Sequence, residues 1–228
     1  MDIRSKLMQI AGKGDFQLDS RIPTSYIFRL CLKYGWMLIR GRYRRYRGVF
    51  IGRHVKLYCT NMLSIGKKTK VRDYVKIDAL STDGISIGKY CVIGENTKLE
   101  ATGSLEHLGK GIRIGDRSTF GSDCYFGAAG GITIGNDVMA GQYIRFHSEN
   151  HNYLDTTRLI REQGVTHKGI RVGNNCWIGA GAVFLDGASL GDGCVVGANA
   201  VVTGSFPANS VIAGVPAKII KKREQTNG

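Results

Sequence analysis

The heptapeptide HSENHNY, residues 147–153, concentrates side chains that can do chemistry. It holds His147 and His151, two of the five histidines of the chain, together with one carboxylate and two amides. Histidine serves both as a metal ligand and as a general base near neutral pH. The same residue types are also common in polar loops. Three interpretations are therefore open: a metal site, a catalytic base with its helpers, or a loop without chemistry.

The sequence that must position this heptapeptide is repetitive. An aliphatic residue followed by glycine recurs in units of six, and strong copies lie 18 residues apart, so three hexapeptides complete one turn of a coil. The copies begin at Ile87, Ile93, Ile114, Ile134, Val172, Ile178, Leu190 and Val196, with weaker ones at Ile51 and Ile65. We expect the aliphatic residues to stack inside the coil. We expect the glycines to allow the backbone conformations of its corners.

The fifth position of each hexapeptide holds a small residue that should also point inward. Its occupants are Cys91, Thr97, Ser118, Cys124, Val138, Cys176, Ala182, Cys194 and Ala200. Four of the six cysteines fall in this set, and no Cys-x-x-Cys pair with the spacing of a zinc ligand occurs. Cys176 and Cys194 should be neighbours on adjacent turns, close enough for a disulfide by Cα distance. We interpret them as reduced core residues.

Composition and charge narrow the class of protein. Glycine makes up 32 of 228 residues, about twice the usual ~7%, and no Gly-X-Y period exists, so the glycines must serve a folded β structure. Residues 1–56 hold 13 Lys and Arg against three Asp and Glu, which is far too uneven for a uniformly basic nucleic-acid binder. The absence of an export signal favours the cytoplasm, where the cysteines should stay reduced.

The basic N-terminal region also carries an apolar stretch. Residues 25–38 are rich in aromatic and aliphatic side chains, but Arg29 and Lys33 interrupt a segment that is already too short to span a bilayer. The basic run LIRGRYRRYRG, residues 38–48, follows directly. This pattern predicts either a helix packed on its own domain with a solvated basic end, or an interfacial segment that rests on anionic lipid.

The repeat breaks once over a long distance. Ile134 opens a turn whose successor begins only at Val172, 38 residues later instead of 18. The surplus predicts one long excursion over residues 147–169. Loops that leave a regular scaffold often carry function, and HSENHNY lies at the root of this one.

These segments resemble a known family. The order TIGNDVMAGQYIRFHSENHNY, then a loop, then IRVGNNCWIGAGAVFLDG and AGVPAKIIKK is similar to the galactoside, maltose and xenobiotic branch of the hexapeptide-repeat acetyltransferases, and most of all to its capsule and O-antigen O-acetyltransferases. The resemblance implies an all-β fold, a left-handed parallel β-helix built of hexapeptide repeats over residues 49–218. A partly helical basic N-terminal extension (1–48) would precede it, and a basic C-terminal tail (219–228) would follow.

The same resemblance implies an activity. The chain would be an acetyl-CoA-dependent O-acetyltransferase that modifies a sugar hydroxyl in surface polysaccharide or glycolipid biosynthesis. His151 would act as general base in a direct-transfer ternary complex, with no metal, and Glu149 or a backbone carbonyl could fix its tautomer. The protein would be a cytoplasmic homotrimer with active sites between subunits. The basic apolar N-terminus would suit a lipid-linked carbohydrate acceptor and contact with the inner face of the membrane.

Further residues are carried over from the family pattern. The predicted cofactor-binding residues are Trp177, Ala180, Ala198, Thr203, Lys218 and Lys221. The predicted acceptor-binding residues are His147, Asn150, Tyr153, Arg158 and Arg161. The chain departs from the pattern at Gly204, where the family often has lysine, and near Gly127, where galactoside-type members have an acceptor-orienting asparagine. Acceptor binding must therefore be arranged differently.

Three alternatives stay open beside O-acetyl transfer. The first is N-acetylation of an amino sugar. The second is a zinc enzyme like the γ-class carbonic anhydrases, although His54, His107 and His167 do not complete that family's pattern of three histidines. The third is a β-helical assembly module without catalysis.

Overall fold

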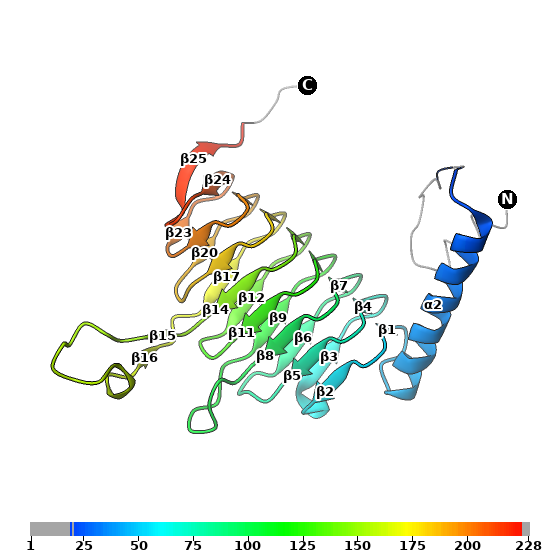
Figure 1. Ribbon diagram of the computed structural model, residues 1–228, viewed down its shortest axis with the longest axis horizontal. Coiled ribbons are helices and arrows are strands. Elements are labelled where there is room, and N and C mark those ends of the chain that lie inside the picture. The colour runs from blue at the N-terminus through cyan, green and yellow to red at the C-terminus, as the bar shows by residue number, and fades with distance from the viewer. Residues whose placement is uncertain (1–18, 20, 225–228) are drawn as a thin grey trace.

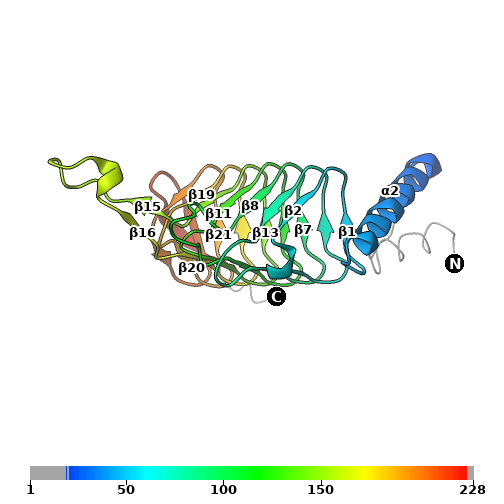
Figure 2. The same ribbon diagram turned by 90° about the horizontal axis from the view of Figure 1, so that it is seen from below.

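The computed structural model describes Asp19 and residues 21–224 as a three-sided coil of short strands, with one long helix at its N-terminal end (Figures 1 and 2). Helix α2 (Thr24–Tyr43) precedes the coil, and each turn then contributes one strand to each of three sheets. The strands that join successive turns are parallel. The predicted left-handed parallel β-helix is confirmed.

The three sheets are named A, B and C in the order in which the chain visits them. Sheet A comprises β1 (Phe50–Ile51), β4 (Lys70–Val71), β7 (Val92–Ile93), β10 (Thr119–Phe120), β13 (Met139–Ala140), β18 (Trp177–Ile178), β21 (Val195–Val196), β24 (Ser210–Ala213) and β25 (Lys218–Lys222). Sheet B comprises β2 (Lys56–Tyr58), β5 (Lys76–Asp78), β8 (Lys98–Glu100), β11 (Tyr125–Gly127), β14 (Arg145–His147), β19 (Val183–Phe184) and β22 (Val201–Val202). Sheet C comprises β3 (Leu63–Ile65), β6 (Ile85–Ile87), β9 (Ile112–Ile114), β12 (Ile132–Ile134), β17 (Ile170–Val172), β20 (Ser189–Leu190) and β23 (Ser205–Phe206).

The core of the coil is built as the repeat predicts. The aliphatic residues that open the eight strong hexapeptides are all buried, and so are the nine small residues at the fifth positions. Cys176 and Cys194 are free thiols inside the coil, as expected. Sheet B adds a stack of aromatic rings, in which Phe146 lies 4.8 Å from both Phe126 and Phe184 between ring centroids.

The glycines of the hexapeptides are required for a reason other than the one predicted from the sequence. Left-handed corner conformations fall on other residues, such as Tyr90, Arg117 and Asn175. The glycine after each aliphatic residue instead lies directly against the next turn. A Cβ on Gly94, for example, would meet the carbonyl oxygen of Gly121 at 2.1 Å. These positions require glycine because consecutive turns approach too closely for any side chain.

Helix α2 is fixed to the first turn of the coil. The ring of Tyr34 lies 5.6 Å from that of Phe50 between centroids, and a Cβ on Gly41 would lie 2.0 Å from the carbonyl oxygen of Val49. The guanidinium groups of Arg40 and Arg44 donate hydrogen bonds to the carbonyl oxygens of Ile51 and Val55 respectively. No helix among the described residues is long and apolar enough to cross a membrane.

The long excursion leaves the corner between sheets B and C (Figure 1). Its two sides form a small antiparallel ribbon of β15 (Asn150–His151) and β16 (Val165–Thr166), with a 3-10 helix at Ile160–Glu162 beyond it. Strand β14 ends at His147 and β17 begins at Ile170, next to the predicted limits of 147–169. The segment between β8 and β9, residues 101–111, makes a second, shorter excursion at the same corner.

The ends of the coil lie close to the predicted domain boundaries. The first strand begins at Phe50, and β25 continues the last sheet as far as Lys222. The division into residues 1–48, 49–218 and 219–228 stays a prediction. Residues 1–18 and 20 of that extension and residues 225–228 of that tail lie outside the described residues.

Candidate active site

Hydrogen bonds at both ends of the excursion hold its root in place. Ser148 is fully buried; its hydroxyl donates to the carbonyl oxygen of Gly127 and accepts the N–H of Gly130, both at 3.0 Å. Glu149, where the chain leaves the coil, contacts His167, where it returns, with 2.6 Å between Oε2 and Nε2. Glu149 was a candidate for fixing the tautomer of His151. The structure gives this carboxylate to His167 instead.

A pocket of about 260 Å³ lies beside this root, on the outer side of sheet B, and is here called the histidine pocket. Both His147 and His151 line it, together with Glu100, Tyr125 and Glu149. His147 is half-buried on β14, whereas His151 is exposed on β15. An exposed imidazole at a pocket wall can exchange a proton with a bound hydroxyl, so this arrangement suits a general base.

The floor of the histidine pocket is a chain of polar contacts along sheet B. The Tyr125 hydroxyl donates to Glu100 Oε2 at 3.2 Å, and Lys76 Nζ donates to Glu100 Oε1 at 2.8 Å. The rings of Tyr125 and His147 lie 5.5 Å apart between centroids. The hydrogen bond from Lys76 is the main reason that the pKa of Glu100 is lowered. Glu100 is therefore a carboxylate at neutral pH.

Tyr125 also explains the departure from the family at Gly127. A Cβ at position 127 would lie 3.0 Å from Cε1 of the Tyr125 ring. The ring therefore occupies the space that an asparagine side chain would need. This chain presents an aromatic ring with its hydroxyl where galactoside-type members are expected to present an amide.

The two histidines differ in their electrostatic surroundings. Burial lowers the pKa of His147 below its ordinary value of 6.5, and the nearby cation of Arg145 lowers it further. His147 is therefore neutral at pH 7. A neutral imidazole in this position can accept or donate a hydrogen bond to a bound hydroxyl.

The effect of Arg145 on His147 gives a prediction for the Arg145→Gln variant. We expect the pKa of His147, followed by NMR of the imidazole, to rise toward 6.5 in the variant but to stay below it, because burial is the larger cause of the lowering. Folding stability contributed by neutral His147 is complete above the unfolded pKa of ~6.5 and falls as the pH drops from there through the lower folded pKa. Arg171→Gln, an exposed arginine on sheet C, is the control. An unchanged titration in Arg145→Gln would assign the whole shift to burial.

A second pocket of about 520 Å³ lies on the excursion itself and is here called the loop pocket. Asn150, His151, Tyr153 and Arg158 line it, so His151 is shared by both pockets. The Arg158 guanidinium donates to the carbonyl oxygen of Glu162 and helps to close the end of the loop. Arg161 is exposed and lines neither pocket. The structure thus brings four of the five predicted acceptor residues to His151, counting His147 in the histidine pocket.

The predicted cofactor-binding residues lie elsewhere. Trp177 points outward from β18 in sheet A, and Lys218 and Lys221 lie on β25 of the same sheet. Ala180 and Ala198 are stacked at the corner between sheets A and B, where the N–H of Asn199 donates to the carbonyl oxygen of Ala180. Thr203 follows β22 and is therefore at the other corner, between sheets B and C. Five of the six residues share one side of the coil, and Thr203 does not.

His151 and Trp177 face away from each other within one chain. Trp177 lies on sheet A, and His151 leaves the corner between sheets B and C, which is opposite sheet A in a three-sided coil. A donor that contacts Trp177 of one chain cannot reach His151 of the same chain by a short path.

Several polar residues of the site were not singled out from the sequence. Glu100 and Tyr125 belong to the lining of the histidine pocket, and Thr102 and Gly103 of the shorter excursion complete it. The distance from Ile87 to Ile114, 27 residues instead of 18, was the available signal for that second excursion. Among residues 19 and 21–224, no group of three or more His, Cys, Asp or Glu side chains could hold a metal ion.

Comparison with known proteins places this architecture in a class. The bacterial transferase hexapeptide family (six repeats) matches residues 169–204, and the hexapeptide repeat of succinyl-transferase matches residues 111–141. A Bacillus cereus N-acyltransferase, AntD, solved as a mutant with dTDP and coenzyme A, has the same fold, with a TM-score of 0.51, 20% identity, and coverage of 78% of this chain and 82% of that one. The fold is that of the hexapeptide-repeat transferases.

Two relatives narrow the class. A probable acetyltransferase of Mycobacterium tuberculosis is 30% identical over 189 residues, which cover 83% of this chain but only 58% of that protein. WbbJ of Escherichia coli K12, named for O-acetyl transfer in lipopolysaccharide biosynthesis, is 32% identical over 137 residues, which cover 57% of this chain and 70% of WbbJ. This chain belongs to the hexapeptide-repeat acetyltransferase family.

Proposed function

We propose that this enzyme transfers an acetyl group from acetyl-CoA to a hydroxyl of a carbohydrate, with His151 as the general base. The observation that carries the proposal is the position of His151 in the walls of both the histidine pocket and the loop pocket. The resemblance to O-acetyltransferases of surface polysaccharides, WbbJ among them, supports a sugar hydroxyl as the acceptor.

The chemistry needs only one proton carrier. The acceptor oxygen attacks the thioester carbonyl while the neutral imidazole of His151 takes the hydroxyl proton. Collapse of the tetrahedral intermediate breaks the C–S bond and forms the ester, and the imidazolium returns its proton to the coenzyme A sulfur. Burial raises the pKa of Cys124 and of Cys176 to about 11. These thiols are protonated at neutral pH, which favours direct transfer over a cysteinyl acyl-enzyme.

The donor and the base come from different chains in this proposal. Coenzyme A would lie along sheet A of one chain, beside Trp177, with Ala180 and Ala198 at the pantetheine arm and Lys218 and Lys221 near the phosphates. Because His151 faces the opposite side of its own chain, the base must come from a neighbouring copy. A homotrimer with three equivalent sites satisfies this requirement with closed symmetry.

The acceptor would bind between the two pockets of one chain. The Tyr125 hydroxyl and the neutral His147 offer hydrogen bonds on the histidine-pocket side, and Asn150, Tyr153 and Arg158 do so on the loop side. Arg161 lines neither pocket, and Thr203 lies at the corner between sheets B and C. Acceptor contact by Arg161 and cofactor contact by Thr203 stay predictions. A larger or elongated acceptor suits a site that continues from one pocket into the next.

Labelled acetyl-CoA and a panel of sugar acceptors provide the test. We expect label in a product that mild base releases, because an O-acetyl ester is base-labile. A base-stable product would replace the hydroxyl with an amine as the acceptor. Absence of transfer to every saccharide in the panel, together with the absence of acetyl-CoA binding by calorimetry, would contradict acetyl transfer altogether.

We also propose that the outer face of α2 rests on the anionic inner face of a membrane. The residues of that face are apolar or aromatic, exposed, and spaced three or four apart: Phe28, Leu32, Trp36, Ile39 and Tyr43. Arg29 and Arg42 lie at its two borders, where they can meet lipid phosphates. The buried residues Ile27, Met37 and Gly41 lie on the opposite side of the helix.

The two tryptophans of the chain allow a matched test of this face. Trp36 is 59% exposed on α2, and Trp177 is 57% exposed on sheet A. We expect Trp36→Ala to weaken co-sedimentation with phosphatidylglycerol vesicles roughly fivefold, because partial burial of one aromatic ring contributes about 1 kcal/mol. Trp177→Ala should leave co-sedimentation unchanged. Equal effects of both substitutions, or binding that ignores the vesicle charge, would contradict membrane contact through α2.

A further inference from the structure

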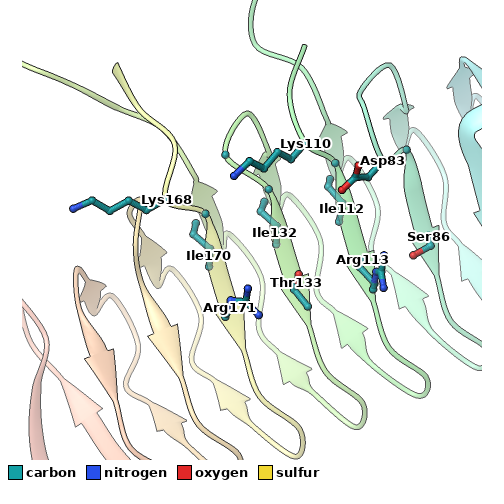
Figure 3. A pocket seen from close by; sticks show the side chains of 15 residues that line it. Asp83, Ser86, Lys110, Ile112, Arg113, Ile132, Thr133, Lys168, Ile170 and Arg171 are labelled. Atoms are coloured by element: carbon teal, nitrogen blue, oxygen red, sulfur yellow. The ribbon is translucent and has the colours of Figure 1, made fainter. Parts of the chain in front are cut away.

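A groove of about 360 Å³ lies on the outer face of sheet C (Figure 3). His151 does not line it. Four cationic side chains line it: Lys110, Arg113, Lys168 and Arg171. They come from two stretches of sequence almost 60 residues apart, before and within strands β9 and β17. The groove lined by these four residues is here called the cationic groove.

The strand register arranges the four cations as a frame. Thr133 of β12 pairs with Arg113 on one side and with Arg171 on the other. The two arginines are therefore two strand spacings apart, about 9–10 Å. Lys110 and Lys168 stand three residues before the arginines, ahead of the same two strands, and the matching position ahead of β12 is Gly130.

The middle of the frame is small and open. Between the paired cations, β12 and its approach contribute Gly130, Gly131, Ile132 and Thr133 to the lining, and the side chain of Ile132 is almost fully buried. Gly131 has a φ of 93° and a Cβ there would lie 3.2 Å from the Cβ of Lys110, so a larger residue is disfavoured at that point. A ligand can consequently approach the sheet between the four side chains.

Among the described residues, the four cations outnumber the carboxylates that line the groove with them. Within residues 19 and 21–224, none of the four side chains forms an ion pair. Asp83 is the one carboxylate in the lining; it lies two residues before β6, at one end of the groove, and its backbone N–H donates to the carbonyl oxygen of Lys110. Four positive charges thus meet one negative charge on an open surface.

The position of Lys168 is fixed by a buried carboxylate. Asp186, 6% exposed, accepts the N–H groups of Lys168 and Gly169 and the hydroxyl of Thr166. The end of the excursion is therefore held rigidly where it joins the groove. Lys168 lines the loop pocket as well as the cationic groove, so it joins the groove to the pocket that His151 lines.

We propose that the cationic groove binds a diphosphate group. Two adjacent phosphates carry two to three negative charges over a length that fits inside the frame, arginine binds phosphate oxygens in pairs, and lysine adds a point charge. Thr133 can donate a further hydrogen bond. Both a nucleoside-diphosphate sugar and a lipid-diphosphate sugar present this chemistry.

The groove also defines the class of acceptor, and this step rests on the proposed acetyl transfer. A diphosphate held between the four cations would carry its attached sugar past Lys168 toward His151. The acceptor would then be a glycosyl diphosphate rather than a free sugar. The binding of the diphosphate itself does not depend on catalysis.

Calorimetry with inorganic pyrophosphate tests the groove in the full-length protein. We expect Arg113→Gln/Arg171→Gln to weaken binding roughly tenfold or more, since each lost hydrogen bond to a charged group is worth about a factor of ten. Arg45→Gln/Arg47→Gln removes the same charge from exposed residues beside the first turn of the coil and should bind as the native protein does. Equal affinity in the two double variants would overturn the proposal.

Sedimentation velocity separates a ligand site from a contact between copies. If the groove variant loses its native oligomeric state while the Arg45→Gln/Arg47→Gln variant keeps it, the cations belong to a subunit interface and the proposal fails. An unchanged oligomer with weakened pyrophosphate binding supports the groove as a ligand site.

Acetylation assays then show which kind of diphosphate-linked sugar is the acceptor. They also separate diphosphate binding by the groove from the proposed acetyl transfer. We expect the groove variant to raise KM for a diphosphate-linked sugar at least tenfold, with kcat little changed and with a free-sugar acceptor unaffected. A nucleoside-diphosphate sugar in solution and a polyprenyl-diphosphate sugar in vesicles are the two arms. Pyrophosphate binding at the groove without any acetyl transfer would retain the groove and reject the proposed function. An equal increase in KM for free and diphosphate-linked sugars would reject the groove as the binding site of the acceptor's diphosphate.

Discussion

Replacement of His151 by alanine should lower kcat for acetyl transfer by about 10²–10⁴-fold, the range that a positioned general base contributes. The side chain is exposed at the wall shared by the two pockets, so its removal leaves the coil core untouched. Folding should consequently be unaffected, and circular dichroism and the melting temperature should match those of the native enzyme. Steady-state kinetics with labelled acetyl-CoA measure the effect.

The matched control is His147→Ala, because the two histidines line the same pocket. His147 is a contact residue in the proposed site, so its loss should raise KM for the acceptor more than it lowers kcat. Near-native turnover of the His151→Ala enzyme would contradict the assignment of His151 as the general base. A larger loss of kcat in His147→Ala than in His151→Ala would transfer the role of base to His147.

The same variant tests whether the site is shared between chains. Co-expression of His151→Ala with Trp177→Ala would create mixed trimers in which some interfaces combine an intact base with an intact donor groove. About a quarter of the sites should then be complete if each site takes one group from each neighbour. Activity no higher than the mean of the two separate variants would place both residues in one chain and contradict the trimeric site.

The fold could be predicted from the repeat, because the position of a residue within its hexapeptide determines whether its side chain points inward. Ile93 and Ile178 are buried where the period requires, and Cys124 and Cys176 fill the small inward positions. Parallel strands on successive turns place equivalent positions side by side. Periodicity alone therefore determined most of the core.

The role of the repeat glycines was less accessible to sequence reasoning. Glycine is associated with left-handed corners, yet Asn175 and Tyr90 take those conformations here. Gly94 is required because the carbonyl of Gly121 on the next turn comes within 2.1 Å of where its Cβ would be. This steric constraint comes from the backbone of the next turn, so it cannot be recognised in the sequence of a single hexapeptide.

The candidate site was also predictable from the sequence only in part. The excursion and its two histidines followed from the 38-residue break in the repeat. The partners of those residues did not, because they come from the preceding turn: Ser148 is hydrogen-bonded to Gly127 and Gly130, and the ring of His147 lies beside that of Tyr125. Sheet register decides such neighbours, and it can be assigned only after every excursion has been located.

The stack of phenylalanines behind the site gives the largest expected effect on stability. Phe146 lies between Phe126 and Phe184 with both centroid distances at 4.8 Å, and all three rings are fully buried. Phe146→Ala would remove the middle ring and leave a cavity that the neighbouring turns cannot close. We expect a loss of about 3–5 kcal/mol in the free energy of unfolding. At ~2–4 °C per kcal/mol for a chain of this size, the melting temperature should fall by roughly 6–20 °C.

Phe28→Ala is the matched control, since it makes the same truncation on the outer face of α2, where the ring is 61% exposed. Its cost should stay within about 0.5 kcal/mol, the usual range for surface substitutions. Phe146→Leu should fall between the two, because it keeps more of the volume. Urea denaturation of the three variants gives the order. If Phe146→Ala costs no more than Phe28→Ala, the stack does not hold the turns of the coil together at β14. The position of His147 and of the excursion root would then depend on the hydrogen bonds of Ser148 alone.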